Sequence, residues 1–149
     1  MFKKILVGID GSAMGDKAFN TALTLAKGWG AELFLVHVMP MPTLPNVFPP
    51  GAIAYVPESV LQDLTREIKE KAEKTLEERL NQVKEKGVTG QIKVLKGEPA
   101  SAIASFAQEE GIDLIVVGSR GISGVKELML GSVSHKISQL ARCPILIVK

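Results

Sequence analysis

Residues 118–134 read GSRGISGVKELMLGSVS, a glycine-rich segment that decides how this chain can fold. The segment follows the apolar run LIVV at residues 114–117, which is typical of a strand buried on both faces of a parallel sheet. It precedes residues 133–141, where the sequence VSHKISQLA predicts a helix. A glycine-rich loop between the carboxyl end of a strand and the amino end of a helix is where an α/β fold binds an anion.

The residue types in this segment suit a phosphate-binding loop. Its glycines are Gly118, Gly121, Gly124 and Gly131. Glycine lets backbone N–H groups approach a ligand closely and tolerates positive φ angles. Ser132 and Ser134 add hydroxyl donors, and the first turn of the following helix adds unpaired N–H groups. A second interpretation stays open, because such loops also simply turn corners and Ser132 could do no more than cap its helix. The segment fits neither the Walker A pattern nor G-x-G-x-x-G.

The composition is that of a small globular domain. The chain has 149 residues, of which 46% are hydrophobic, so we expect one domain over residues 1–149 with a sizeable core. The net charge of +2, with lysines mixed among glutamates, gives no reason to expect a nucleic-acid partner. A single cysteine excludes an internal disulfide and fits a reducing compartment. We find neither a signal-peptide pattern nor an apolar run approaching the roughly 18 residues of a membrane span, so we expect a cytoplasmic protein without membrane contact.

Apolar runs and helical patterns alternate along the chain. Strands are predicted at residues 5–9, 33–38, 91–96, 114–117 and 145–148. Helices are predicted between them. The longest covers residues 58–86, and its apolar stripe favours packing on the sheet over a coiled-coil contact. Right-handed crossovers between such units give a single α/β domain with an open parallel five-stranded sheet and helices on both faces. Residues 40–57 contain six prolines and predict a loop, which could be either a flap over a ligand or a variable surface insertion.

Polar residues at the predicted strand ends are the candidates for chemistry. Asp10 could cap the following helix, or it could accept from a ribose hydroxyl or help to hold a metal near phosphates. His37 could be a general base, but the missing partner groups favour a structural hydrogen bond. Arg120 could reach phosphate or ribose oxygens or could be solvated, and Lys126 is a weaker candidate of the same kind. Glu98 lies near a predicted helix start, where a carboxylate suits the dipole, and is given no ligand role.

Several stretches together resemble the universal stress protein family, in its ATP-binding branch. The pattern G-x2-G-x9-G-S runs from Gly118 to Ser132. The resemblance continues through KKILVGIDGS at 3–12, LVHV at 35–38, GEP at 97–99, DLIVVGSRG at 113–121 and CPILIV at 143–148, nearly the whole chain. It implies a fold like that of the adenine nucleotide alpha hydrolases, with strand order 3-2-1-4-5 and a switch point between the first and fourth strands.

The resemblance also implies an adenine nucleotide at that switch point. Asp10 would lie beside the nucleotide, and the backbone of Val38 would pair with the adenine edge. ATP, rather than AMP or another adenine nucleotide, rests on the resemblance alone, with Mg²⁺ or Mn²⁺ carried mainly on the phosphates. No catalytic residue is assigned. The candidate nucleotide-binding residues are Gly8, Asp10, Val38, Val117, Gly118, Arg120, Gly121, Gly124, Gly131, Ser132, Val133 and Ser134.

Three functions follow from these observations. The leading hypothesis is a dimeric, ATP-binding stress-response module. The second is a slow ATPase or nucleotide hydrolase, for which the sequence offers Asp10, Arg120 and Lys126 but no assembled catalytic set. The third is a ligand-free dimeric interaction protein, which would leave the glycine-rich segment without a task. The last predicted strand is an apolar edge, and the resembled family dimerises there, so we expect a homodimer through residues 144–149.

Overall fold

The computed structural model of this chain describes residues 1–39, 57–121 and 130–149. Strands and helices alternate through these ranges, as the sequence predicts. The strands are β1 (Lys4–Gly8), β2 (Glu32–Met39), β3 (Gly90–Lys96), β4 (Leu114–Gly118) and β5 (Ile145–Val148). The helices are α1 (Ala13–Trp29), α3 (Glu58–Glu85), α4 (Pro99–Glu109) and α5 (Ser132–Leu140).

The strands form one five-stranded sheet in the order β3-β2-β1-β4-β5, and every neighbouring pair is parallel. The predicted fold class and strand order are therefore confirmed. The central strand β1 pairs with β2 on one side and with β4 on the other. The direction of winding reverses between β1 and β4, and this reversal opens a crevice at the carboxyl ends of the two strands.

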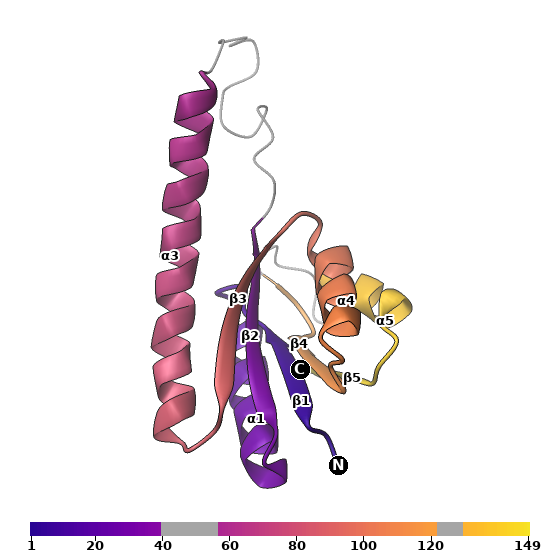
Figure 1. Cartoon of the computed structure of the whole chain (residues 1–149). Coiled ribbons are helices and arrows are strands. Elements are labelled where there is room, and N and C mark those ends of the chain that lie inside the picture. The colour runs from indigo at the N-terminus through magenta and orange to yellow at the C-terminus, as the bar shows by residue number, and fades with distance from the viewer. Residues whose placement is uncertain (40–56, 122–129) are drawn as a thin grey trace.

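Helices cover both faces of the sheet (Figure 1). Successive side chains of a strand point to opposite faces, so β1 contributes Ile5 and Val7 to the core beneath α1 and α3, and Leu6 to the core beneath α4 and α5. All three side chains are fully buried. Burial on both faces explains why the central strands are apolar without alternation.

Helix α3 is longer than the sheet that it packs on. Its 28 residues span about 42 Å, whereas the seven residues of β3 beside it span about 23 Å. Leu76 and Val83 in its carboxyl-terminal half are buried, but Ile68 is 41% exposed and Val60 is 51% exposed. The predicted packing of an apolar stripe against the sheet therefore holds for the carboxyl-terminal half, and the amino-terminal half extends past the strand ends (Figure 1).

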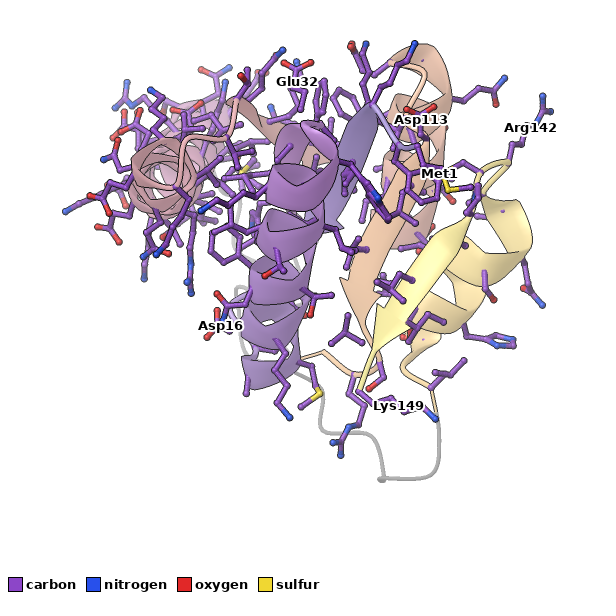
Figure 2. The ribbon with its side chains drawn as sticks, turned by 90° about the horizontal axis from the view of Figure 1, so that it is seen from below. Met1, Asp16, Glu32, Asp113, Arg142 and Lys149 are labelled. Carbon is purple, nitrogen blue, oxygen red and sulfur yellow. The ribbon has the colours of Figure 1, made fainter. Side chains whose placement is uncertain are left out.

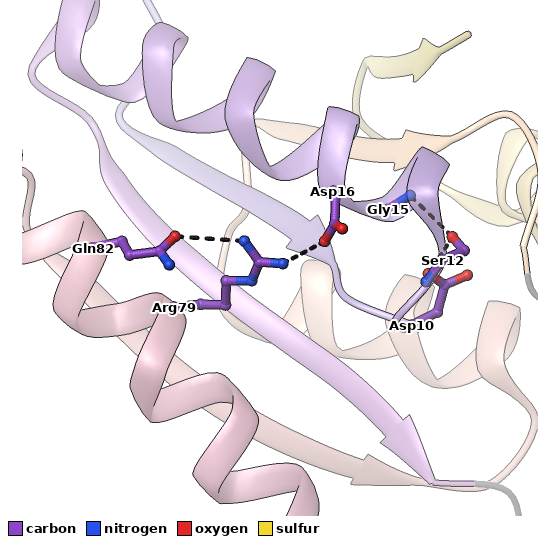
Figure 3. Close-up of polar contacts among 6 residues, drawn as sticks. All are labelled: Asp10, Ser12, Gly15, Asp16, Arg79 and Gln82. Atoms are coloured by element: carbon purple, nitrogen blue, oxygen red, sulfur yellow. Dashed lines mark hydrogen bonds and ion pairs between the residues drawn. The ribbon is translucent and has the colours of Figure 1, made fainter.

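Charged side chains fix α3 to α1 (Figure 3). Arg79 of α3 forms an ion pair with Asp16 in the first turn of α1, and its Nη1 atom lies 3.5 Å from the Gln82 side-chain oxygen. The guanidinium also stacks over the ring of Phe19, 5.0 Å from its centroid. These contacts hold the two helices of this face in a fixed relation next to the carboxyl ends of the strands.

The opposite end of the sheet is closed by Asp113, which lies near the amino terminus of the chain (Figure 2). Its Oδ2 atom accepts from the backbone N–H groups of Lys3 and Lys4 at 2.8 and 2.9 Å. These two hydrogen bonds lower the pKa of the Asp113 carboxyl below its ordinary value. Asp113 thus joins the segment before β4 to the start of β1 and helps to set the alignment of the two strands that flank the crevice.

Residues 40–56 of the predicted proline-rich loop lie outside the described residues, and Pro57 is the residue that precedes α3. Among the helices described, none is long and apolar enough to cross a membrane.

Candidate functional site

The carboxyl ends of the strands enclose a cavity of about 200 Å³ at the switch point. Its walls come from the ends of β1, β2 and β4, the first turns of α1 and α4, and the start of α5. Every predicted nucleotide-binding residue that the structure describes lines this cavity, namely Gly8, Asp10, Val38, Val117, Gly118, Arg120, Gly121, Gly131, Ser132, Val133 and Ser134. Gly124 lies outside the described residues.

Asp10 has one oxygen that bonds to the following turn and one that makes no hydrogen bond to the residues that the structure describes. Its Oδ1 atom accepts from the Ser12 backbone N–H at 2.9 Å and from the Ser12 hydroxyl at 2.6 Å. Ser12 in turn caps α1, because its Oγ atom accepts from the backbone N–H of Gly15 at 3.0 Å (Figure 3). Of the two possible caps, Ser12 and Asp10, the structure assigns Ser12, which Asp10 holds in place. The second Asp10 oxygen, Oδ2, lies toward Gly121 across the cavity.

At two of the cavity glycines, neighbouring atoms leave no room for a side chain. A Cβ atom on Gly121 would be 3.0 Å from Asp10 Oδ2, and one on Gly118 would be 2.8 Å from the backbone carbon of Met14. Gly118 is therefore required by the packing of β4 against the first turn of α1. Gly8 differs, since the nearest atoms to a Cβ there are 3.5 and 3.8 Å away. None of the described cavity glycines has a positive φ, so their tolerance of left-handed backbone, expected from the sequence, is not used.

The start of α5 borders the cavity with amides that have no partner within the helix. Gly131 is the N-cap residue, and no side chain among the described residues caps the helix. The N–H groups of the first three helical residues, Ser132 to Ser134, have no intrahelical partner because an α-helix lacks earlier carbonyls for them. They carry the positive end of the helix dipole. Ser132 and Val133 are exposed, and Ser134 is buried.

A small hydrogen-bonded junction holds this helix start in place. The Ser134 hydroxyl lies 3.0 Å from the Gly131 carbonyl and 3.2 Å from the Ser119 carbonyl, which both accept from it. The Ser119 carbonyl also accepts from the Gly131 N–H at 2.7 Å, and the Ser119 N–H donates to the Val148 carbonyl at 2.7 Å. The Ser134 hydroxyl proton, expected to point at a ligand, is thus used inside the loop, and its backbone N–H remains for a ligand.

His37 is held by a hydrogen bond to the backbone, as expected. Its Nδ1 atom lies 2.7 Å from the carbonyl oxygen of Ile9. A carbonyl oxygen can only accept, so Nδ1 carries the proton and Nε2 is left as the acceptor of the neutral ring. Val38 follows at the end of β2, where its backbone groups border the cavity. The structure places no acidic partner on the His37 ring among the described contacts, which argues against a general base.

The opposite wall of the cavity begins at Glu98, the N-cap residue of α4. Its carboxylate accepts from the backbone N–H groups of Ala100 and Ser101 and from the Ser101 hydroxyl, and it pairs with Lys136 of α5 at 3.2 Å. The hydrogen bonds from Ser101 are the main reason that the pKa of Glu98 falls from 4.5 to about 2. Glu98 acts on the helix dipole, as predicted, and also ties α4 to α5 beside the cavity.

The other candidate groups differ in how they relate to the cavity. Arg120 is half-buried in its lining, whereas Lys126 lies outside the described residues. Cys143 is partly buried, and this burial raises the pKa of its thiol, so it is a poor nucleophile. In the described part of the chain, no three His, Cys, Asp or Glu side chains gather as metal ligands.

Sequence reasoning missed several residues of the cavity wall. Pro99 and Ile103 of α4 and Gly15 of α1 lie in the lining but were not predicted to do so. Gly15 would have been hard to find, because a Cβ there would be 2.5 Å from Asp10 Oδ1 and only the folded cap reveals this contact. Pro99 carried a usable signal, since it begins a helix three residues after the end of a strand at the same edge of the sheet.

Known proteins resemble this chain along its full length. Residues 1–149 match the universal stress protein family. The chain belongs to that family. The universal stress protein YxiE of Bacillus subtilis is 49% identical over 149 residues, which cover 100% of both chains. The structure of universal stress protein UspA from Lactobacillus plantarum superposes with a TM-score of 0.82 at 23% identity, covering 99% of this chain and 98% of that one.

Two solved members of the family contain a nucleotide. A protein from Arabidopsis thaliana with AMP bound has a TM-score of 0.68 and 23% identity, covering 99% of this chain and 91% of that one. A universal stress protein from Archaeoglobus fulgidus in complex with dAMP has a TM-score of 0.67 and 21% identity, covering 99% of this chain and 98% of that one. At these identities the likeness of this universal stress protein to them is one of fold.

Proposed function

We propose that this universal stress protein binds an adenine nucleotide, with ATP as the physiological ligand, in the cavity at the switch point. The observation that carries the proposal is the start of α5, which no side chain of the described residues caps. Gly131 has no side chain to cap the helix, and the amides of Ser132, Val133 and Ser134 border the cavity. Such a helix end is a ready site for phosphate. Family members with AMP and dAMP bound support the choice of an adenine nucleotide.

The remaining walls suggest how the nucleotide would lie. The phosphates would accept from the α5 amides, with Arg120 beside them. The adenine would pair with the backbone of Val38, and its ring would pack on apolar groups such as Ile103. The ribose would then pass Asp10, whose Oδ2 atom can accept from a hydroxyl group. Mg²⁺ or Mn²⁺ would be carried on the phosphates, which supply the oxygen ligands that these ions prefer.

Binding is favoured over hydrolysis by the state of the polar groups. One oxygen of Asp10 already accepts two hydrogen bonds from Ser12, and the His37 ring is bonded to the Ile9 carbonyl. Neither arrangement resembles a base poised to activate water against a phosphate. A slow ATPase remains the second candidate, and intact ATP after hours with the protein would exclude it.

We further propose that the protein is a cytoplasmic homodimer with a regulatory role. Strand β5 is an edge of the sheet, paired with β4 on one side. Its apolar residues include Leu146, which is 36% exposed. Pairing β5 with the same strand of a second copy would cover this edge. Sedimentation of the purified protein tests the proposed dimer, and a monomer at all concentrations would refute it.

A proline substitution tests the contribution of the α5 amides. Ser132 is the first helical residue, where proline is tolerated, and Gly131 already has the extended backbone that a following proline requires, with φ of −61° and ψ of 154°. Ser132→Pro removes one N–H without breaking the helix, whereas Ser132→Ala removes only the hydroxyl. Losing a hydrogen bond to a charged phosphate costs about 1.5–3 kcal/mol, or roughly ten- to hundredfold in Kd.

The measurement is calorimetric titration of both variants with ATP and AMP. We expect Ser132→Pro to bind much more weakly than Ser132→Ala, with equal melting temperatures for the two proteins. Equal affinities would mean that the phosphates do not contact this amide. Failure of the parent protein to bind any adenine nucleotide would refute the proposed function itself.

A further inference from the structure

A second hollow, of about 370 Å³, adjoins the switch-point cavity beneath α3. One side is formed by α3, which contributes Ile68, Ala72 and Leu76. The other side is formed by the segment that follows β1. The hollow lies on the α3 side of the sheet, away from α4 and α5.

The two spaces share part of their walls. Ile9, Asp10 and His37 line both of them. Asp10 and His37 therefore stand at the boundary between the two spaces. In the proposed binding mode this is the position of the ribose, because Asp10 Oδ2 is the acceptor that remains for a ribose hydroxyl.

The second hollow has the chemistry of a site for an apolar group. Three aliphatic side chains of α3 face Ile9 across it. The Thr75 hydroxyl donates to the Lys71 carbonyl at 3.1 Å, so its proton is used within the helix. Ala72 leaves space in the middle of the wall, where a larger residue would fill the hollow. Lys71 adds a cation, whose N–H groups can meet a carbonyl or an anionic oxygen at the edge of such a group.

We infer that the second hollow accepts an apolar group attached to the ribose of a bound adenine nucleotide, so that this protein prefers ribose-substituted nucleotides over unsubstituted ones. The inference rests on the proposed nucleotide binding and deepens it. The ligand class is an adenine nucleotide whose ribose carries an acyl or aromatic ester. The shared Asp10 and His37 side chains are where its two parts join.

The probe is ATP esterified on one of its two ribose hydroxyls with an N-methylanthraniloyl group, which fluoresces more strongly in apolar surroundings; the other hydroxyl remains to donate to Asp10. Its affinity is compared with that of ATP by titration. At about 25 cal/mol per Å² of buried apolar surface, covering about 60 Å² of the added group corresponds to roughly tenfold tighter binding. We therefore expect about a tenfold lower Kd and a rise in fluorescence that excess ATP reverses.

Variants on α3 locate the added group. Ala72→Phe fills the hollow and should abolish the tenfold gain and the fluorescence rise, while leaving the affinity for ATP unchanged. Lys74→Phe adds the same side chain to the exposed side of the same helix and should behave as the parent protein. Ile68→Ala removes part of the wall at a partly exposed position and should reduce the gain without affecting folding.

The outcomes separate the two levels of the proposal. If ATP binds and the ester binds no more tightly, or if Ala72→Phe lowers both affinities equally, the inference is overturned and the proposed function stands. If the gain survives in both Ala72→Phe and Ile68→Ala, the added group lies elsewhere and the inference is again overturned. If neither nucleotide binds, the proposed function fails and the inference fails with it.

Discussion

The most informative test of the packing around the site compares two glycines at the ends of adjacent strands. Gly8 ends β1 and Gly118 ends β4, and both line the cavity. A Cβ atom on Gly118 would lie 2.8–2.9 Å from three atoms of Met14, two of which are backbone atoms. A Cβ atom on Gly8 would meet only side-chain atoms of Val117 and Ile103, at 3.5 and 3.8 Å.

The expected cost of Gly118→Ala follows from these distances. Ordinary van der Waals contact begins at 3.4 Å, so the first turn of α1 would have to move by at least half an ångström. Such overpacking costs about 1–3 kcal/mol. Gly8→Ala meets no such obstacle, and the lower entropy of its unfolded chain offsets small losses by about 0.4–1 kcal/mol. The two variants should therefore differ in free energy of unfolding by about 2 kcal/mol.

Urea denaturation measures this difference directly. For a chain of this size, about 2 kcal/mol corresponds to a Tm lower by about 4–8 °C and to a lower urea midpoint at an unchanged m-value. Gly8→Ala should keep the parent midpoint. Equal midpoints for the two variants would show that α1 yields freely at Met14, and the packing explanation for Gly118 would then be wrong.

Three further predictions concern contacts around the site. Glu98→Gln should lower the free energy of unfolding at neutral pH, because the folded pKa of Glu98 is depressed from 4.5 to about 2. The difference from the parent should persist above pH 4.5 and vanish as the pH falls toward 2, and a difference independent of pH would contradict this prediction. Ser134→Ala removes the hydrogen bond of a buried hydroxyl and should lower the free energy of unfolding by about 1 kcal/mol, as measured by urea denaturation. An unchanged value would mean that water replaces the hydroxyl. Arg79→Met should lower the free energy of unfolding by about 1 kcal/mol, because the contacts with Asp16 and Phe19 are lost. Arg79→Lys should recover only the part of this free energy that the charge of the side chain supplies.

The fold could be predicted from the sequence because its signals are local and repeated. The buried strands are apolar runs with no polar alternation, and the first helix begins at a recognisable cap, Ser12. The edge position of the last strand also followed from the family resemblance. The sequence predicts the length of α3, but not that only its carboxyl-terminal half packs on the sheet. A helical stripe reports only which face is apolar, and it does not report that the neighbouring strands stop halfway along the helix.

The site could be predicted as a set of residues but not as a set of interactions. The strand-end rule placed Asp10 and Gly118 at one edge. It could not say that Ser12 takes up one oxygen of Asp10, or that Gly118 is small because Met14 packs against it. Those facts depend on distances between segments far apart in the sequence. For the same reason the hollow beneath α3 has no signature in the sequence, since its walls come from the segment after β1 and from a helix more than fifty residues away.

Ser119 joins the last strand and the helix start through its main chain alone. Its N–H group bonds to the end of β5, and its carbonyl bonds to the Gly131 amide. Nineteen of the twenty amino acids could supply both groups, so an alanine scan would pass over this position as unimportant. Proline, which has no N–H group to donate, would detach the strand from this segment, so a position that an alanine scan passes over would prove to be a fastening point of the domain.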